Sequence, residues 1–318
     1  MKLFIKKISI FLIPGLLLAY PADLFLSHLL KNTSSAQGEF EVWNDIYQSK
    51  TNVSIAIYGS SRAWIHIDPN ILEDSLHRST YNFGIDGQNI WLHLFRHNQI
   101  IQYNTKPKTI LYSLDIFTLG SRSGYYNSKQ HLPYLLWNED YFNSELFPNI
   151  FNWCDYFIPM VRFQNKGDQI LYSMLLYFRH APLRNKGFAG MDREWNTDFE
   201  TIKAKQKGFI TKIDSTSVAL LKSFLSECAK DSIQVIFVYT PEYIQGQKFT
   251  TNRSELMTLY KQIATEYNIP FLDYSNHEIC YNKNNFYNTT HMNGTAATRF
   301  SQILAEDIKP LLTYQENN

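Results

Sequence analysis

The hydrophobic residues between positions 53 and 274 include four short, almost continuous apolar runs. These runs are VSIAIYG (53–59), KTILYSL (108–114), SIQVIFVY (232–239) and IPFLDY (269–274). Their length and their content of β-branched and aromatic residues are typical of strands that are buried on both faces. Because helices cover both faces of a parallel sheet, the pattern predicts an α/β protein with a mostly parallel sheet.

Apolar residues recur at helical spacing in three further segments. These are DSTSVALLKSFLSECAKDS before the third run, TNRSELMTLYKQIATEYN after it, and TAATRFSQILAEDIKPLL near the end of the sequence. The first helix is expected to begin at Asp214 or Ser215 and the second at Thr251 or Asn252, because such side chains cap helix N-termini. The alternation predicts a three-layer α/β/α sandwich, in which ligands bind at the carboxyl ends of the strands.

In the first thirty residues, MKLFIKKISIFLIPGLLLAYPADLFLSHLL, Lys2, Lys6 and Lys7 precede a mostly apolar run that reaches Leu30 and is long enough to span a bilayer. Lysines before the run favour an N-terminus on the inner side. Tyr20 is unsuited to a signal-peptidase site after Ala22, and the apolar residues continue to Leu30. We therefore expect a retained membrane anchor at 1–34 and an extracytoplasmic domain at 35–318, with a cleaved export signal as the alternative.

Residues 118–212 interrupt the alternation of strands and helices. The segment is dense in aromatic residues and shows no clear strand pattern. We expect an inserted, helical, aromatic-rich cap on the sheet domain. Sugar-binding surfaces use such aromatics, but hydrophobic cores also contain them, and the sequence leaves both interpretations open.

Composition excludes several classes of function. A chain of 318 residues with 44% hydrophobic residues is able to form a sizeable core, and a formal net charge of +1 argues against nucleic acid as a partner. The three cysteines, Cys154, Cys228 and Cys280, lie far apart and show no CxxC spacing. We therefore expect no disulfide framework, no metal site and no cofactor.

The first apolar run leads directly into Gly59-Ser60-Ser61-Arg62. A glycine lets the chain turn sharply, so that Ser61 presents its hydroxyl at the strand end. By itself the motif is a weak signal, because serine and glycine are ordinary turn residues. A nucleophilic serine also needs a base, a group that orients the base, and donors for the oxyanion. His291, just before the last predicted helix, is the candidate base.

Three stretches of the chain resemble sequence blocks of the SGNH/GDSL hydrolase superfamily. Gly59-Ser60-Ser61 matches the first block, Asn82, Gly84 and Gly87 in YNFGIDGQNI match the second, and Asn288-Thr289-Thr290-His291 matches the last. The chain is similar in particular to the membrane-anchored extracytoplasmic branch, which includes alginate O-acetylation proteins and the D-alanyl-transfer protein of teichoic acid synthesis. The resemblance covers roughly residues 50–120 and 210–312.

This resemblance implies a flavodoxin-like fold and a role for each matched residue. It makes Ser61 the nucleophile and His291 the base, and it assigns the oxyanion to the backbone N–H groups of Ser61 and Gly87. The alternative is that Gly84 and Gly87 are only turn glycines. The resemblance also implies an acylated polysaccharide or glycan as substrate and a multipass membrane acyltransferase as a partner.

Two positions depart from the family pattern. Leu114, beside Asp115, stands where active hydrolases have an asparagine donor, and losing one oxyanion donor costs about 10² to 10³ in rate. Asn288 stands at the acid position, and an amide there costs about 10⁴ when it holds the wrong histidine tautomer. Asp273 is the first candidate for a substitute acid, followed by Asp86 and Asp115. Each of these aspartates is also an ordinary turn or capping residue.

Other polar residues are expected at the same edge of the sheet. Arg62, Asp115 and Glu242 are candidate substrate contacts, and Arg62 would suit a sugar carboxylate or phosphate. The alternatives are an ion pair for Arg62 and simple solvation for Glu242. His66 competes as the base, although its place in WIHIDP favours a packing role.

The sequence thus predicts a membrane-anchored SGNH-type esterase or acyltransferase that acts on acyl esters of a cell-surface polysaccharide. The alternative is a catalytically degraded SGNH scaffold that binds glycan or a membrane acyltransferase. Leu114 and Asn288 support the scaffold, whereas the presence of both Ser61 and His291 favours the enzyme.

Overall fold

The computed structural model describes residues 2–32, 39–122, 126–147, 149–168, 170–171, 175, 184–196, 198–205 and 207–312. The chain divides into two compact units. One unit comprises Met1–Asn44 and Asn127–Leu183, and the other comprises Asp45–Tyr126 and Arg184–Asn318. The expected anchor and most of the expected cap therefore belong to the first unit, whereas the chain from Arg184 onward belongs to the sheet unit.

The sheet unit is built on five parallel strands in the order β2-β1-β3-β4-β5. Their bounds are β1 Ile55–Tyr58, β2 Thr80–Asn82, β3 Thr109–Ser113, β4 Gln234–Tyr239 and β5 Phe271–Asp273. The apolar runs predict four of these strands correctly. They miss β2, because it has only three residues and two of them are polar.

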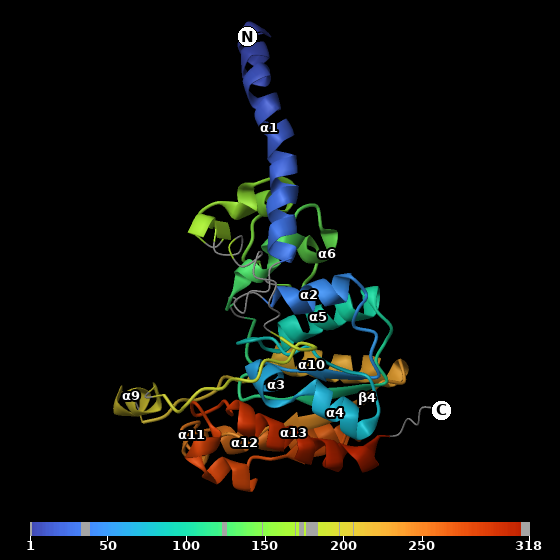
Figure 1. Cartoon of the computed structure of the whole chain (residues 1–318), viewed down its shortest axis with the longest axis vertical. Helices are drawn as coiled ribbons and strands as arrows, with labels where there is room; N and C mark the ends of the chain where they lie inside the picture. The colour runs from blue at the N-terminus through green and yellow to red at the C-terminus, as the bar shows by residue number, and fades with distance from the viewer. Residues whose placement is uncertain are drawn as a thin grey trace. The chain divides into compact units, whose positions relative to one another are not determined.

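Helices cover both faces of this sheet. The helices of the sheet unit are α3 Ser61–His66, α4 Pro69–Leu76, α5 Ile90–Tyr103, α9 Asp198–Lys205, α10 Ser215–Lys230, α11 Ile244–Gln247, α12 Arg253–Glu266 and α13 Gly294–Ile308, with 3₁₀ turns η3 Glu278–Tyr281, η4 Lys283–Asn285 and η5 Lys309–Leu311. Figure 1 shows α5 and α10 on one side of the sheet and α4 and α13 on the other. The predicted three-layer sandwich is confirmed.

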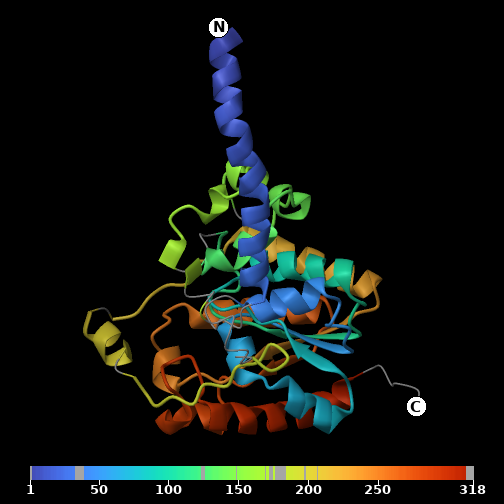
Figure 2. The same cartoon turned by 45° about the horizontal axis from the view of Figure 1, so that its top comes forward.

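Alternating side chains of the strands produce two cores. Ile55, Ile57 and Leu111 pack with α4 and α13, which lie side by side along the lower edge of Figure 2. On the other face, the rings of Tyr58 and Tyr112 pack against Phe224 of α10. Successive side chains thus alternate between the two cores, and the pairing of the strands determines which residues emerge at the carboxyl ends.

The other unit contains a long apolar helix and several short helices. Its elements are α1 Lys2–Lys31, η1 Ser128–Tyr134, α6 Glu139–Phe142, α7 Trp153–Phe157 and η2 Val161–Phe163, and α2 Phe40–Tyr47 lies across the division. The segment Lys6–Lys31 is long and apolar enough to cross a membrane, with a mean hydropathy of 1.8, although signal sequences share these properties. Several aromatic rings here pack on one another, as Tyr141 does on Phe147.

The last turns of α1 are integrated into this unit by polar contacts. Asp23 is fully buried, accepts the N–H of Met160 at 2.7 Å and forms an ion pair with Arg162. The same guanidinium donates to the hydroxyl of Ser27 at 2.9 Å. Removing one partner of a buried ion pair is strongly destabilising, because the other charge is left unpaired, so the end of α1 is a structural part of its unit.

Candidate active site

Ser61 and His291 lie in direct contact, although 230 positions separate them in the sequence. Ser61 Oγ is 2.8 Å from His291 Nε2. Ser61 is the first residue of α3, directly after β1, and Ser60 caps this helix by accepting the N–H of Arg62. His291 precedes α13, which packs against α3. The packing of these two helices therefore brings His291 to Ser61.

The turn between β1 and α3 requires glycine. Gly59 has a φ of +142°, and a Cβ at this position would lie 2.6 Å from the carbonyl oxygen of Ser113. A side chain is therefore excluded both by the backbone conformation and by the neighbouring strand β3. The glycine of the Gly-Ser-Ser motif thus permits the close approach that places Ser61 at the edge of the sheet.

Asn288 occupies the acid position through its amide oxygen. Its Oδ1 is 3.1 Å from His291 Nδ1 and also accepts the backbone N–H groups of Thr290 at 3.0 Å and His291 at 2.9 Å. Backbone N–H groups only donate, so they orient the oxygen of the amide, and not its nitrogen, toward the ring. His291 therefore donates from Nδ1, which leaves Nε2 to accept the hydroxyl of Ser61. The amide favours the productive tautomer and lacks only the negative charge.

The surroundings of His291 keep its ring neutral. Burial, followed by the positive charge of Arg62, lowers the pKa of His291 to about 4, with Glu242 opposing the shift and Arg193 adding to it. The ring is thus unprotonated throughout the neutral range. The low pKa also reduces the driving force for removing the proton of Ser61.

Replacing Asn288 by aspartate is expected to raise the pKa of His291 and the rate together. A carboxylate would stabilise the imidazolium that forms during attack, and hydrogen bonds to charged groups are worth about 1 kcal/mol more than neutral ones. The kcat/KM for an aryl acetate at pH 7 should therefore rise about tenfold. Because only the neutral ring accepts a proton, wild-type activity should fall with an apparent pKa near 4, and this acid limb should move to higher pH in Asn288→Asp.

The pH profile needs a control for acid unfolding, which circular dichroism at each pH provides. An acid limb near the ordinary histidine pKa in the wild type would contradict this description of His291. A lower rate in Asn288→Asp, with the fold intact, would contradict the assignment of Asn288 to the acid position.

Two of the three aspartates expected as substitute acids, Asp273 and Asp115, are engaged elsewhere. Asp273 accepts the N–H of Ser275 at 3.1 Å and lies 3.5 Å from Lys261 Nζ, so it is a turn aspartate with a surface ion pair. Asp115 accepts the hydroxyl of Ser60 at 2.6 Å. Asn288 already occupies His291 Nδ1, and Asp273 is the ordinary turn aspartate that the sequence left open as the alternative.

Arg62, Asp115 and Glu242 pair with one another in the interior. Arg62 Nη1 lies 3.3 Å from Asp115 and 3.1 Å from Glu242, and no side chain of the three is more than 3% exposed. Glu242 also pairs with Arg253 at 2.7 Å, and Arg62 donates to the backbone carbonyl of Thr240. The ion pair that the sequence left open as the alternative for Arg62 is therefore present, and Glu242 is paired and not simply solvated. The three residues connect the carboxyl ends of β3 and β4 to α3.

The backbone N–H groups of Ser61 and Gly87 are the candidate oxyanion donors. Gly87 is exposed and has a φ of +64°. Its loop is joined to the end of β1 by a hydrogen bond of 2.8 Å from Ile85 N–H to the carbonyl of Gly59. Leu114 is fully buried and donates its N–H to Val238 at 2.9 Å, so it supplies no third donor.

Asn82 and His66 are structural supports of the site. Asn82, in the second block, donates to the carbonyls of Ala63 and Ile67, each at 2.8 Å, and so supports the end of α3. His66 is fully buried, and its Nε2 accepts the N–H of Met292 at 2.9 Å. Burial and the charge of Arg62 lower the pKa of His66 well below its ordinary value. His66 therefore fixes the backbone beside His291. Ser61 contacts His291 and not His66.

Sequence reasoning missed two residues beside the base. The ring of Tyr287 is stacked on His291 with centroids 5.4 Å apart and planes 9° apart, and the guanidinium of Arg193 lies 5.7 Å from the centroid of Tyr287. Tyr287 stands only four positions before His291, and this closeness in the sequence could have identified it. Arg193 belongs to no recognisable motif.

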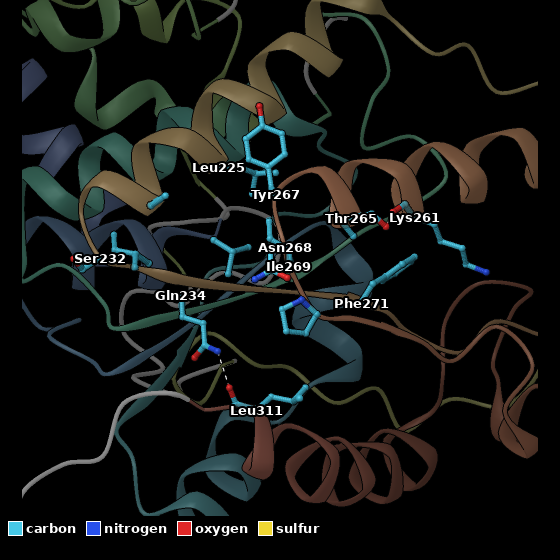
Figure 3. A pocket seen from close by; sticks show the side chains of 15 residues that line it. Leu225, Ser232, Gln234, Lys261, Thr265, Tyr267, Asn268, Ile269, Phe271 and Leu311 are labelled. Atoms are coloured by element: carbon cyan, nitrogen blue, oxygen red, sulfur yellow. Dashed lines mark hydrogen bonds between the residues drawn. The ribbon is translucent and has the colours of Figure 1, made fainter.

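The opposite edge of the sheet contains a hollow of about 940 Å³ at the start of β4 and β5 (Figure 3). Gln234 in its wall donates to the carbonyl of Leu311 at 2.6 Å, and Lys261 is the one charged side chain of the lining. It contains no pair of an acid and a base. Among the described residues, no three His, Cys, Asp or Glu side chains converge as metal ligands, and all three cysteines are unpaired.

Comparison with known proteins gives distant similarities of fold. No protein-family model and no curated protein matches the chain. A Bacteroides fragilis protein described as a candidate acylhydrolase matches 81% of this chain and 87% of its own, with 12% identity and a TM-score of 0.40. A Desulfitobacterium hafniense protein described as a candidate lipolytic protein of the G-D-S-L family matches 80% of this chain and 98% of its own, with 10% identity and a TM-score of 0.39. These similarities assign no activity to the chain.

Proposed function

We propose that this protein is an SGNH-type serine esterase or O-acyltransferase that acts on acyl esters of a cell-surface polysaccharide. The observation that supports it most directly is an unbroken series of hydrogen bonds. Ser61 Oγ lies 2.8 Å from His291 Nε2, and His291 Nδ1 lies 3.1 Å from the oxygen of Asn288. A nucleophile, a base and a group that orients the base are the parts that acyl transfer requires.

In the proposed reaction, Ser61 Oγ attacks the carbonyl carbon of the ester while its proton passes to His291 Nε2. The N–H groups of Ser61 and Gly87 stabilise the oxyanion. As the tetrahedral intermediate collapses, the bond to the alcohol breaks and the alcohol takes the proton from His291. Water or a sugar hydroxyl then attacks the acyl-serine in the same way, which gives hydrolysis or transfer. One missing oxyanion donor predicts a reaction about 10² to 10³ slower than that of a complete site.

The proposal places the enzyme on the outer face of a membrane, with α1 as a retained anchor. The hydropathy of Lys6–Lys31 permits this position. The buried pair of Asp23 and Arg162 supports retention, because a leader that is removed would leave the arginine without its carboxylate. A multipass acyltransferase stays a predicted partner.

A fluorophosphonate probe, which phosphonylates nucleophilic serines, tests the proposed function. Wild-type protein should be labelled and Ser61→Ala should not. Ser226→Ala, which removes an exposed hydroxyl on α10, is the matched control and should label like the wild type. Equal labelling of Ser61→Ala and wild type would refute the proposal. Absence of labelling from both would favour the glycan-binding scaffold.

A further inference from the structure

A segment of the sheet unit that no motif includes crosses the vicinity of the active serine. Residues 184–196, drawn in yellow in Figure 2, hydrogen bond to three elements in turn. The carbonyl of Lys186 accepts from β2 at 2.9 Å, Ala189 donates to the carbonyl of Trp64 in α3 at 3.1 Å, and the carbonyl of Met191 accepts from the start of α13 at 2.9 Å. The segment is thereby fixed to the helix that begins with Ser61 and to the helix that follows His291.

Arg193 follows directly on this fixed part of the segment. Its N–H donates to the carbonyl of Met191 at 3.0 Å, and its guanidinium lies over the ring of Tyr287. Because Tyr287 is stacked on His291, the guanidinium is joined to the catalytic base through one aromatic ring. The backbone turn and the cation–π contact together position this exposed charge at the site.

Arg193 also differs from the other arginines of the site in its partners. Arg62 and Arg253 are neutralised by Asp115 and Glu242. Within the part of the chain that the structure describes, Arg193 forms no ion pair, and its side chain is exposed. A guanidinium without a carboxylate partner presents its N–H groups to solvent, in the planar arrangement that matches a carboxylate or a phosphate.

We propose that Arg193 binds an anionic group of the substrate, a carboxylate or a phosphate, beside the ester that Ser61 attacks. This inference rests on the proposed function and adds to it the substrate class, an anionic glycan. It also gives the site a specificity residue in place of Arg62, which is buried and already paired. The binding is made mainly in the ground state, so its loss should raise KM more than it lowers kcat.

The test compares three methyl glycosides that bear one acetyl ester at the same position: a glucoside, a glucuronoside, and a glucoside with a phosphodiester. The measured quantity is the ratio of kcat/KM for an anionic ester to kcat/KM for the neutral glucoside. Because Arg193→Gln removes charge-assisted hydrogen bonds at an exposed site, we expect it to lower this ratio about tenfold. Arg193→Lys should retain part of this ratio, since lysine keeps the positive charge but lacks the planar pair of N–H donors of the guanidinium. Arg299→Gln removes another exposed arginine, paired with Glu278, and should leave the ratio unchanged.

The pattern over the two anionic esters identifies the source of the anion. A loss with the glucuronoside alone supports a uronate, a loss with the phosphodiester alone supports a phosphate, and a loss with both supports a general anion site. If Arg193→Gln leaves the ratio unchanged for both the glucuronoside and the phosphodiester, the inference is overturned while the proposed function stands.

A binding measurement separates this inference from the proposed function. Titration calorimetry on Ser61→Ala, which does not turn the esters over, measures their affinity directly. Adding Arg193→Gln to this variant should weaken binding of an anionic glycoside about tenfold. If the wild type hydrolyses no ester but this difference in affinity is present, the proposed function fails and the anion site stands. If neither variant prefers the anionic glycosides over the glucoside, the anion site is refuted whatever the rate.

Discussion

Replacing His291 by glutamine is expected to lower kcat/KM for an aryl acetate by about 10² to 10⁴ while leaving the fold intact. In the proposed reaction, His291 Nε2, 2.8 Å from Ser61 Oγ, takes the proton during attack. A positioned general base contributes about 10² to 10⁴ to such a step. Glutamine preserves much of the side-chain volume but accepts no proton at neutral pH. Steady-state kinetics at pH 7 measures the loss, and thermal unfolding shows whether the fold is kept.

His77→Gln is the matched control, because His77 is exposed at the end of α4 and belongs to no part of the site. It should retain wild-type activity. A loss of less than about tenfold in His291→Gln would mean that another group removes the proton of Ser61. His66 would then be the first residue to examine, because its ring lies 6.1 Å from that of His291.

Replacing Arg62 by methionine is expected to lower the free energy of unfolding by about 3 to 5 kcal/mol. Arg62 is 1% exposed and its guanidinium pairs with Asp115 and Glu242. Methionine fills much of the same volume, but it leaves Asp115 in the interior without its cation. The cost of a buried unpaired carboxylate exceeds the loss of the contact itself. Chemical denaturation followed by circular dichroism measures the change.

Arg299→Met provides the contrast, since Arg299 pairs with Glu278 on the surface of α13, where both side chains are more than half exposed. Exposed pairs contribute about 1 kcal/mol or less, so this variant should unfold almost as the wild type does. Equal destabilisation by the two substitutions would contradict the structural role of Arg62. An increase in stability of Arg62→Met would do so as well.

The sequence predicts those parts of the fold whose local pattern is strong. The runs that become β1, β3, β4 and β5 are apolar enough to be recognised, and Asp214 does cap α10 through its side chain. The strand β2 is missed, because it depends on pairing with β1 and not on its own three residues. Pairing across the sheet joins residues that are distant in the sequence, so the pattern of the three residues Thr80–Asn82 does not indicate it.

For the site, the motifs identify Ser61, His291 and Asn288 as neighbours but do not determine how they act. The orientation of the amide of Asn288 depends on backbone N–H groups that exist only in the folded loop. The pairing of Arg62 with Glu242 joins residues from α3 and from the end of β4, so the sequence left substrate binding and ion pairing equally open. Arg193 could not be found from the sequence, because its position depends on the ring of Tyr287.

The most direct measurement is to identify the residue that becomes acylated. Protein mixed with p-nitrophenyl acetate is quenched in acid, digested and analysed by tandem mass spectrometry, with Ser61→Ala treated in parallel. We expect an acetyl group on the side chain of Ser61, and none on the corresponding peptide of Ser61→Ala. An acetyl group on Ser60 or at another site with Ser61 unmodified, or an adduct of equal amount in Ser61→Ala, would contradict Ser61 as the nucleophile.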